Sequence, residues 1–214
     1  MLLPPLYPII DFSCFAAKPD PVWAVVRYAE ELINAGATLI QLRDKTEPAN
    51  TRRFLSCARE LRRVTLDRAT LIINDRVDLC LASDADGVHL GQDDLSPAAA
   101  RRIFDQVKDG KARLIGFSTH NLTQVRQADA LPVDYIAIGP VFTTGSKANP
   151  DPVVGLEGVR QARQVTRKPL VAIGGITRLN CAQVKDSGAD SVALISDLLE
   201  SPGKAVADFL RVLG

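Results

Sequence analysis

The sequence of residues 70–94 is TLIINDRVDLCLASDADGVHLGQDD. Two short runs rich in Ile, Leu and Val, 70–74 and 87–91, flank a short segment at 77–82. Apolar runs of this length favour buried strands, and the segment between them favours a helix. The stretch therefore predicts a strand–helix–strand unit, the connection that joins parallel strands. Each of its two strands is followed at once by polar residues.

The same alternation extends in both directions along the chain. Six further runs predict strands at 7–12, 38–43, 113–118, 135–139, 169–175 and 191–196. Helical spacing and capping residues predict helices over Pro21–Ala35, Pro48–Val64, from Ser96-Pro97 onward, Asn121–Ala130, Gly155–Val165, Arg178–Ser187 and Pro202–Leu213. Gly36 and Gly188 follow two of these segments, where a glycine commonly ends a helix.

Eight strands that recur about every 26 residues have the spacing of βα units. Continuous βα alternation predicts a parallel sheet, and eight units predict an α/β fold, a single (β/α)₈ TIM barrel over residues 1–214. A doubly wound open sheet is the alternative. It is less favoured because no GxGxxG motif follows the first strand.

Composition excludes several classes of protein. The chain of 214 residues has 26 Lys+Arg, 25 Asp+Glu and a net charge of +1, so it lacks the basic excess of a nucleic-acid binder. Four cysteines without a CxxC pair and two distant histidines argue against a zinc site. No apolar run approaches the ~20 residues of a membrane span, and no signal peptide is evident. We expect a cytoplasmic protein that binds neither nucleic acid nor membrane.

Active sites of such barrels lie at the carboxyl ends of the strands, so polar residues there are the candidates. Strand 38–43 ends in QLRDK, and its period of two places Gln41 and Arg43 on one face, with Lys45 beyond them. Two cations and an amide suit a phosphate or diphosphate. The alternative is a solvated strand end with a salt bridge to Asp44.

Carboxylates follow the next two strands. Asp75 comes directly after strand 70–74, and Asp94 lies just beyond strand 87–91. Two carboxylates at neighbouring strand ends can share a Mg²⁺ ion with a substrate phosphate. Asp93 is the alternative to Asp94, and either residue could instead cap the helix that starts near Ser96.

Hydroxyl and glycine residues follow the remaining strands and predict an anion site built from hydroxyl and backbone N–H donors. They include Ser118, the loop Thr143–Lys147, Gly174-Gly175 and Ile195-Ser196. Of the two histidines, His89 is expected to be a hydrogen-bonded structural residue. His120 lies in a loop at the mouth and is the stronger candidate for chemistry.

Seven motifs carry a resemblance to a known family. They are QLRDK (41–45), IIND (72–75), GVHLGQDD (87–94), GFSTH (116–120), GPVFTTGSK (139–147), AIGGI (172–176) and VALIS (192–196). In order and spacing they resemble the thiamine phosphate synthases, over nearly the whole chain. The resemblance implies a (β/α)₈ barrel that couples a hydroxymethylpyrimidine diphosphate to a thiazole phosphate and releases diphosphate, with Mg²⁺.

Site residues follow from the resemblance by position. The pyrimidine-diphosphate site would comprise Gln41, Arg43, Lys45, Asn74, Ser118 and Lys147, with Arg43, Lys45, Ser118 and Lys147 assisting catalysis. Asp75 and Asp94 resemble the magnesium ligands. The thiazole-phosphate site would comprise Thr144, Gly145, Ser146, Gly175, Ile195 and Ser196. Ser146 and Asp197 depart from the family pattern, and a carboxylate at Asp197 would repel a phosphate unless it faces away or binds a cation.

Rival functions remain at this stage. A thiazole tautomerase of the same superfamily would use His120 as an acid–base group and would need no diphosphate–magnesium set. A sugar-phosphate isomerase or epimerase would need a base whose motif is missing here. A non-catalytic protein that binds thiamine precursors is the third rival. The oligomeric state, a homodimer among the options, is left open by the sequence.

Overall fold

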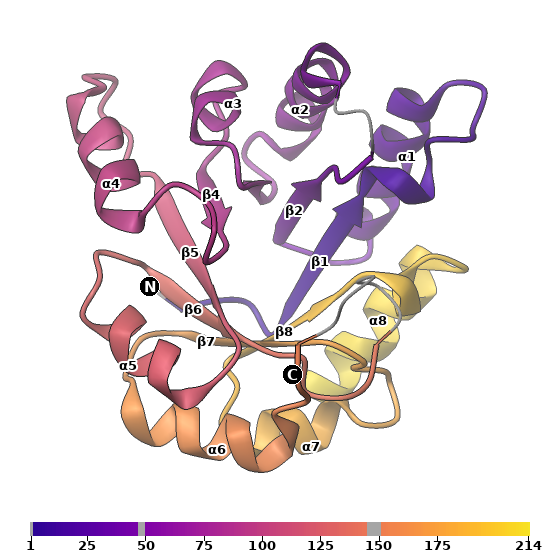
Figure 1. The fold of residues 1–214 in the computed structure, drawn as a ribbon. Coiled ribbons are helices and arrows are strands. Elements are labelled where there is room, and N and C mark those ends of the chain that lie inside the picture. Colours follow the sequence, from indigo (N-terminus) through magenta and orange to yellow (C-terminus); the bar gives the residue numbers. More distant parts are fainter. Residues whose placement is uncertain (1, 47–49, 145–150) are drawn as a thin grey trace.

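The computed structural model describes residues 2–46, 50–144 and 151–214. In these residues the strands are all parallel and close into a barrel in the order β1 to β8, with the helices around it (Figure 1). The strands are β1 Leu6–Asp11, β2 Leu39–Arg43, β3 Thr70–Asn74, β4 Gly87–Leu90, β5 Leu114–Thr119, β6 Tyr135–Ile138, β7 Leu170–Ile173 and β8 Ser191–Leu194. The predicted single (β/α)₈ barrel is confirmed.

Helices follow the strands as the sequence pattern predicts. They are α1 Pro21–Asn34, α2 Thr51–Thr65, α3 Val77–Ala82, α4 Pro97–Gln106, α5 Leu122–Asp129, α6 Gly155–Val165, α7 Cys181–Asp186 and α8 Pro202–Leu213. Two short 3₁₀ helices, Phe12–Cys14 and Ser196–Leu198, follow β1 and β8. Among the helices so described, none is long and apolar enough to cross a membrane.

Capping residues explain where several helices begin. Ser96 accepts a hydrogen bond from the Ala99 N–H at 3.3 Å, and Asn121 accepts one from Gln124 at 2.9 Å, as the sequence predicts. The prediction that α2 begins at Pro48 is wrong, because the Asn50 side chain caps Arg53 N–H at 2.9 Å and the helix begins at Thr51.

The start predicted for α7 at Arg178 is also wrong. The Asn180 side chain accepts a hydrogen bond from Thr177 N–H at 2.7 Å, which closes a turn, and the helix begins only at Cys181. Strand β7 ends at Ile173, earlier than predicted, because Gly174 and Gly175 adopt positive φ angles of 101° and 62°. That region is open to glycine at little cost and to other residues rarely.

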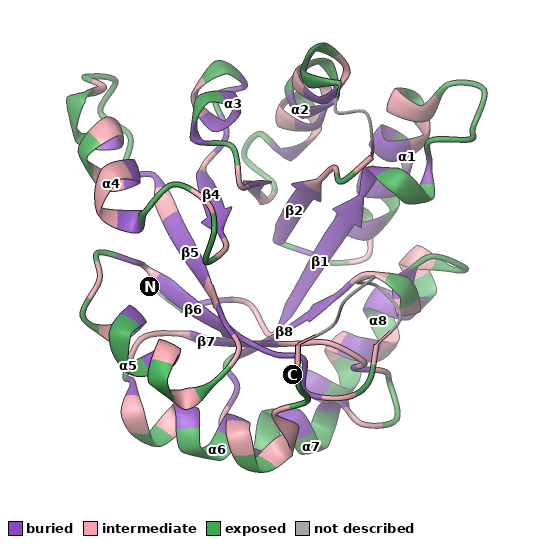
Figure 2. Ribbon diagram, in the orientation of Figure 1, coloured by how far each residue is buried: buried purple, intermediate pink, exposed green. Residues whose placement is uncertain are grey.

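The strands are buried on both faces (Figure 2), so the barrel has two cores. One lies between strands and helices and contains Ile40 and Leu42 of β2. The other fills the barrel interior with Leu3, Tyr7, Ile9, Leu39, Ile72, Tyr135, Ala137, Val171 and Ala193. Gln41 faces this interior and donates to Tyr7 Oη at 2.8 Å. The predicted orientation of β2 is confirmed.

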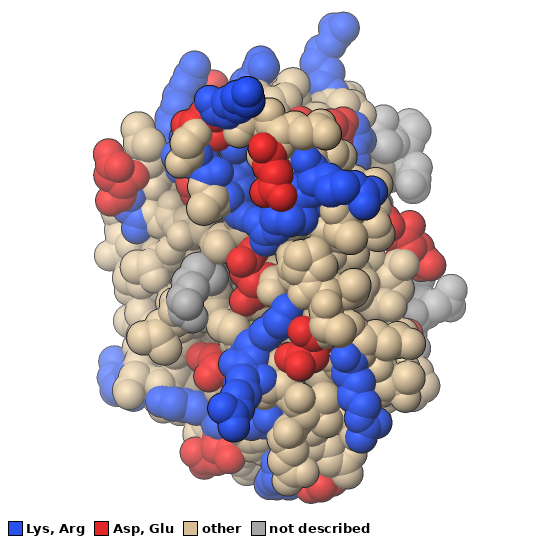
Figure 3. Space-filling view, turned by 90° about the vertical axis from the view of Figure 1, so that its left-hand side faces the viewer, with Lys and Arg blue, Asp and Glu red and all other residues tan. Residues whose placement is uncertain are grey.

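A repeated contact fastens the amino ends of the strands. An aspartate directly before β4, β6 or β8 accepts a hydrogen bond from a backbone N–H in the preceding strand. It also pairs with an arginine of the helix that leads into that preceding strand, α2, α4 or α6. The sets are Asp86 with Leu71 and Arg62, Asp134 with Ile115 and Arg101, and Asp190 with Leu170 and Arg163, at 2.6 to 3.1 Å. On the face that Figure 3 shows, acidic side chains lie among the basic ones.

We expect Asp134→Ala to lower the free energy of unfolding by about 1–3 kcal/mol, because Ile115 N–H loses its side-chain acceptor and the Arg101 guanidinium loses its ion-pair partner. Urea denaturation measures the change. Asp105→Ala, at an exposed position of α4, is the matched control and should change stability little. Equal losses in the two variants would contradict a role for this contact in holding the strands.

Candidate active site

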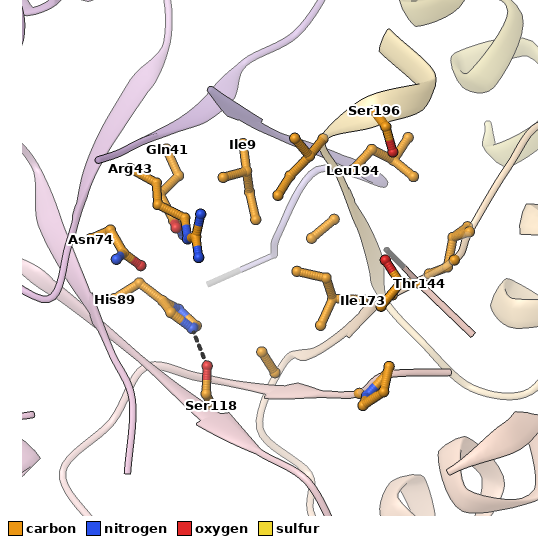
Figure 4. A pocket seen from close by; sticks show the side chains of 18 of the residues that line it. Ile9, Gln41, Arg43, Asn74, His89, Ser118, Thr144, Ile173, Leu194 and Ser196 are labelled. Carbon is orange, nitrogen blue, oxygen red and sulfur yellow. Dashed lines mark hydrogen bonds between the residues drawn. The ribbon is translucent and has the colours of Figure 1, made fainter. Parts of the chain in front are cut away.

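A cavity of about 950 Å³ opens at the carboxyl ends of the strands. Figure 4 shows Gln41, Arg43, Asn74, His89 and Ser118 together along one part of its wall, with Thr144 and Ser196 across from them. Ile9, Ile173, Ala137 and Ala193 supply apolar surface between the two groups. The cavity therefore has two polar ends joined by an apolar floor, a shape that suits a flat ring with a charged group at each end.

Arg43 is held by a residue that the sequence did not single out. Its Nη1 pairs with Asp11 Oδ2 at the end of β1, and both side chains are mostly buried. Asp11 also accepts hydrogen bonds from the Ser13 N–H at 3.0 Å and from the Ser13 hydroxyl at 2.6 Å. Asp44, the alternative partner for Arg43, instead pairs with Arg53 at 3.3 Å. The guanidinium is therefore oriented toward the cavity by β1, not by its own loop.

Lys45, Asp75 and Asp94 lie together at the edge of the cavity. Lys45 Nζ is 2.5 Å from Asp75 Oδ2. Asp75 has a φ of 63°, an uncommon backbone conformation that is found most often in Asn and Asp among residues with a side chain. Asp94 accepts a hydrogen bond from Gly91 N–H at 2.7 Å. It does not cap the following helix, since Ser96 does so.

The two carboxylates are close enough to repel. Burial is the main cause that raises the pKa of Asp94, and the neighbouring Asp75 carboxylate raises it further. A divalent cation would relieve this repulsion, and oxygen is the ligand that Mg²⁺ prefers. Within the described residues no cluster of three or more His, Cys, Asp and Glu is placed to hold a metal. The Asp75 and Asp94 carboxylates would suit an ion that takes waters and substrate oxygens as its other ligands.

Glycines shape the opposite end of the cavity. A Cβ on Gly174 would lie 2.6 Å from Pro140, and one on Gly175 would lie 2.5 Å from the Thr143 carbonyl oxygen. Phe142 N–H donates to Gly174 O at 3.0 Å. The glycine pair therefore lets the loop after β6 pack directly on the end of β7. Of the residues predicted for this end, Gly145 and Ser146 lie outside the described residues. Lys147, predicted for the diphosphate end, lies outside them as well.

Ile195 and Ser196 follow β8 and line the same end of the cavity. Asp197, next to them, has its carboxylate 3.3 Å from Arg178 Nε and accepts from Arg178 N–H at 3.4 Å. This arginine partially neutralises the carboxylate. The repulsion expected between Asp197 and a bound phosphate is reduced accordingly.

Both histidines line the cavity, in different surroundings. His120 Nδ1 is 2.8 Å from Gly139 O and 3.4 Å from Asp151 Oδ2. His89 is buried, with Nδ1 3.1 Å from Tyr135 Oη and Nε2 2.8 Å from Ser118 Oγ. Burial lowers the pKa of His89 to about 4. The prediction that His89 is a hydrogen-bonded residue is confirmed.

Sequence reasoning missed three residues that contact the predicted ones: Asp11, Tyr7 and Tyr135. Tyr7 contacts Gln41, and Tyr135 contacts His89. The alternation of side chains along a strand does place Tyr7 on the same side of β1 as Ile9 and Asp11. This alternation does not indicate which residues of neighbouring strands they contact, because that depends on the register between strands.

The fold and the cavity together define a class of protein, a (β/α)₈ barrel whose mouth combines paired cations, paired carboxylates and a glycine-rich loop suited to anions. Comparison with known proteins identifies the family. The profile of the family described as thiamine monophosphate synthase matches residues 14–198, and the chain belongs to that family.

Individual relatives agree with this assignment. The chain is 51% identical over 211 residues to a thiamine-phosphate synthase of Koribacter versatilis, covering 99% of this chain and 96% of the relative. It is 43% identical to one from Chloroflexus aurantiacus, covering 86% and 82%. A solved structure of thiamine phosphate pyrophosphorylase from Pyrococcus furiosus is 32% identical with a TM-score of 0.81, covering 98% and 95%.

We expect the buried, neutral His89 to make the protein less stable in acid. Between about pH 6.5 and 4 the unfolded chain binds a proton at this ring that the folded chain excludes, so stability falls as the pH falls, by up to about 3 kcal/mol. Urea denaturation at several pH values should show a smaller decline for His89→Gln, with His120→Gln as the control. An unchanged pH dependence in His89→Gln would show that the ring is not held neutral.

Proposed function

We propose that the protein is a thiamine-phosphate synthase, a transferase that joins a hydroxymethylpyrimidine diphosphate to a thiazole phosphate and releases diphosphate. Family membership and the names of the relatives support the reaction. The observation that carries the proposal is the convergence of Arg43 and Lys45 with the Asp75 and Asp94 carboxylates at one end of the cavity. That combination suits a diphosphate bound with a cation, and a single phosphate would not require it.

The chemistry needs little more than charge stabilisation and proximity. A pyrimidine that carries a 4-amino group stabilises a methylene cation, so C–O cleavage can precede attack by the thiazole nitrogen. That nitrogen has no proton to lose, and no general base is required. Arg43, Lys45 and Ser118 would stabilise the negative charge that develops on the departing diphosphate. Lys147, outside the described residues, is proposed to assist them.

Mg²⁺, held by Asp75 and Asp94, would supply further positive charge to the leaving group. Gln41 and Asn74 line the same end of the cavity and would orient the pyrimidine and its diphosphate through their amides. At the other end Thr144, Gly175, Ile195 and Ser196 would bind the thiazole phosphate, together with Gly145 and Ser146. The apolar floor between the ends would hold the two rings within reach of each other, and proximity can contribute about 7–11 kcal/mol.

Turnover of both substrates by the purified protein tests the proposal. Thiamine phosphate and diphosphate should form in equal amounts when both substrates and Mg²⁺ are present, and not when either substrate is left out. The same assay separates the rivals. A thiazole tautomerase dependent on His120 would convert its thiazole substrate alone, without releasing diphosphate. A binding protein for thiamine precursors would bind the substrates and form no product, and either result would overturn the proposal.

We expect Asp75→Ala to lower kcat/KM by about two orders of magnitude or more while the fold stays intact, because one of two proposed cation ligands is lost. The Mg²⁺ concentration that gives half-maximal rate should rise as well. Asp78→Asn is the control, because Asp78 is an exposed carboxylate on α3 that pairs with Arg76 at 2.6 Å, and its loss should be much smaller. Similar kinetics in the two variants would remove Asp75 from the proposed metal site.

We expect Arg43→Ala to raise the KM for the pyrimidine-diphosphate substrate about 10- to 100-fold, because hydrogen bonds to charged groups contribute about 1.5–3 kcal/mol to binding. The KM for thiazole phosphate should change little. Arg76→Ala is the matched control, since Arg76 lies near the mouth but pairs with Asp78 at 2.6 Å. Steady-state kinetics with each substrate varied in turn would contradict the proposed division of the cavity if both KM values rose equally.

A further inference from the structure

We propose that Gln41, Tyr7, Tyr135, His89 and Ser118 form one directed chain of hydrogen bonds that keeps the Ser118 hydroxyl proton pointing into the cavity. The two tyrosines and His89 are then positioning residues, because they act on the substrate through Ser118. The inference rests on the proposed function in one respect: the anion that Ser118 would meet is the diphosphate.

The contacts are continuous from the barrel interior to the mouth. Gln41 Nε2 lies 2.8 Å from Tyr7 Oη, and Tyr7 Oη lies 2.8 Å from Tyr135 Oη. Tyr135 Oη lies 3.1 Å from His89 Nδ1, and His89 Nε2 lies 2.8 Å from Ser118 Oγ. Four of the five residues are buried, and Ser118, where the chain ends, is partly exposed to the cavity (Figure 4).

The direction of the chain follows from counting protons. The Gln41 amide nitrogen can only donate, so Tyr7 Oη accepts there. Among the described residues the other hydrogen-bond partner of this buried hydroxyl is Tyr135 Oη, and a Tyr7 proton that pointed elsewhere would have no acceptor, so Tyr7 donates to Tyr135. Tyr135 in turn gives its proton to His89 Nδ1. A neutral imidazole that accepts at Nδ1 carries its proton on Nε2 and donates it to Ser118 Oγ. The Ser118 proton then has no place in the chain, and it is left to be donated to a ligand in the cavity.

Burial keeps every member in the required protonation state. It raises the pKa of both tyrosine hydroxyls above their usual range, so each keeps a proton to donate. His89 is buried as well, and its two ring nitrogens contact the hydroxyls of Tyr135 and Ser118, neither of which carries a charge that would favour the protonated ring. A chain with one proton per link is therefore maintained throughout the neutral pH range.

The neighbouring strand is built to admit the central tyrosine. Gly116 of β5 lies in register between His89 of β4 and Tyr135 of β6. A Cβ on Gly116 would lie 2.1 Å from Tyr135 Cζ, so only glycine leaves room for the ring to reach across β5. The His89 and Tyr135 rings stack with centroids 5.5 Å apart. The Tyr135 side chain, which reaches from β6 to β4, is therefore held between Gly116 and the His89 ring.

A fixed donor suits the proposed reaction. If His89 carried its proton on Nδ1, its Nε2 would accept the Ser118 proton, and Ser118 would offer the cavity only lone pairs, which repel an anion. With the proton on Nε2, the hydroxyl is already oriented before the diphosphate arrives. Donors set in place in advance stabilise developing charge without reorganisation during the reaction.

Nitrogen NMR of the histidine rings tests the direction of the chain without any turnover. The chain has only two histidines, so the spectrum of His120→Gln assigns both. We expect His89 to be neutral at pH 7 with its proton on Nε2, and Tyr135→Phe to shift protonation toward Nδ1, since the Nδ1 acceptor loses its donor. A wild-type His89 that carries its proton on Nδ1 would overturn the proposal, and this measurement still decides if Tyr135→Phe fails to fold.

A double-mutant cycle tests whether Tyr135 acts through Ser118. We expect Tyr135→Phe to lower kcat about tenfold in the wild-type background, as the loss of one oriented hydrogen bond would. In the Ser118→Ala background the same change should have almost no further effect. Equal losses in both backgrounds would mean that Tyr135 has only a structural role and would overturn the proposal.

Tyr28→Phe is the matched control for that cycle. Tyr28 is another buried tyrosine, on α1, where it packs against Phe15 with ring centroids 5.1 Å apart. Its replacement should leave kcat unchanged. A wild-type protein without synthase turnover would overturn the proposed function, whereas the NMR result would still stand or fall on its own.

Discussion

The hydrogen bond between Tyr135 Oη and His89 Nδ1 lies where the packed interior of the barrel meets the cavity at its mouth. Below it the interior is filled by apolar side chains, and above it the interior opens into the cavity. A closed barrel of eight strands has little internal space, so a polar group placed there must find its partner on another strand. Tyr135 meets that requirement only because Gly116 leaves the space on the strand between them. The same contact therefore completes the packing of the core and orients the side chains of the site.

Charges at the mouth are arranged by a related principle. Arg43 and Lys45 each face a carboxylate from a different strand, Asp11 and Asp75. Such pairs hold long side chains in one place, and their net contribution to stability is small where solvent reaches them. Their value in this site is orientation. A diphosphate with its cation would replace water around Lys45, which is half exposed, more easily than around the mostly buried Arg43.

Much of the fold could be predicted because its signals are local. Each strand is a short apolar run, and caps such as Ser96 and Asn121 act within three residues. The helix starts that were wrong, at Pro48 and Arg178, depended on Asn50 and Asn180, whose side chains bind backbone groups only once the turn has formed. The candidate site was predictable where residues follow strand ends in sequence. Asp11 and Tyr135 were not, because their roles depend on which strands are neighbours and in what register.

The two ends of the cavity offer an anion different kinds of group. At the proposed diphosphate end the groups are charged side chains at or just beyond the ends of β2, β3 and β4, and Arg43 is positioned by a cross-strand partner, Asp11. At the other end residues 140–143 pack on Gly174 and Gly175, so uncharged backbone groups and hydroxyls line the cavity where the thiazole phosphate is proposed to bind. A leaving group that gains charge in the transition state needs strong, preorganised electrostatic stabilisation. A phosphate that only anchors the nucleophile does not, because its charge is unchanged by the reaction. The asymmetry of the cavity thus matches the asymmetry of a reaction in which one end departs and the other is retained.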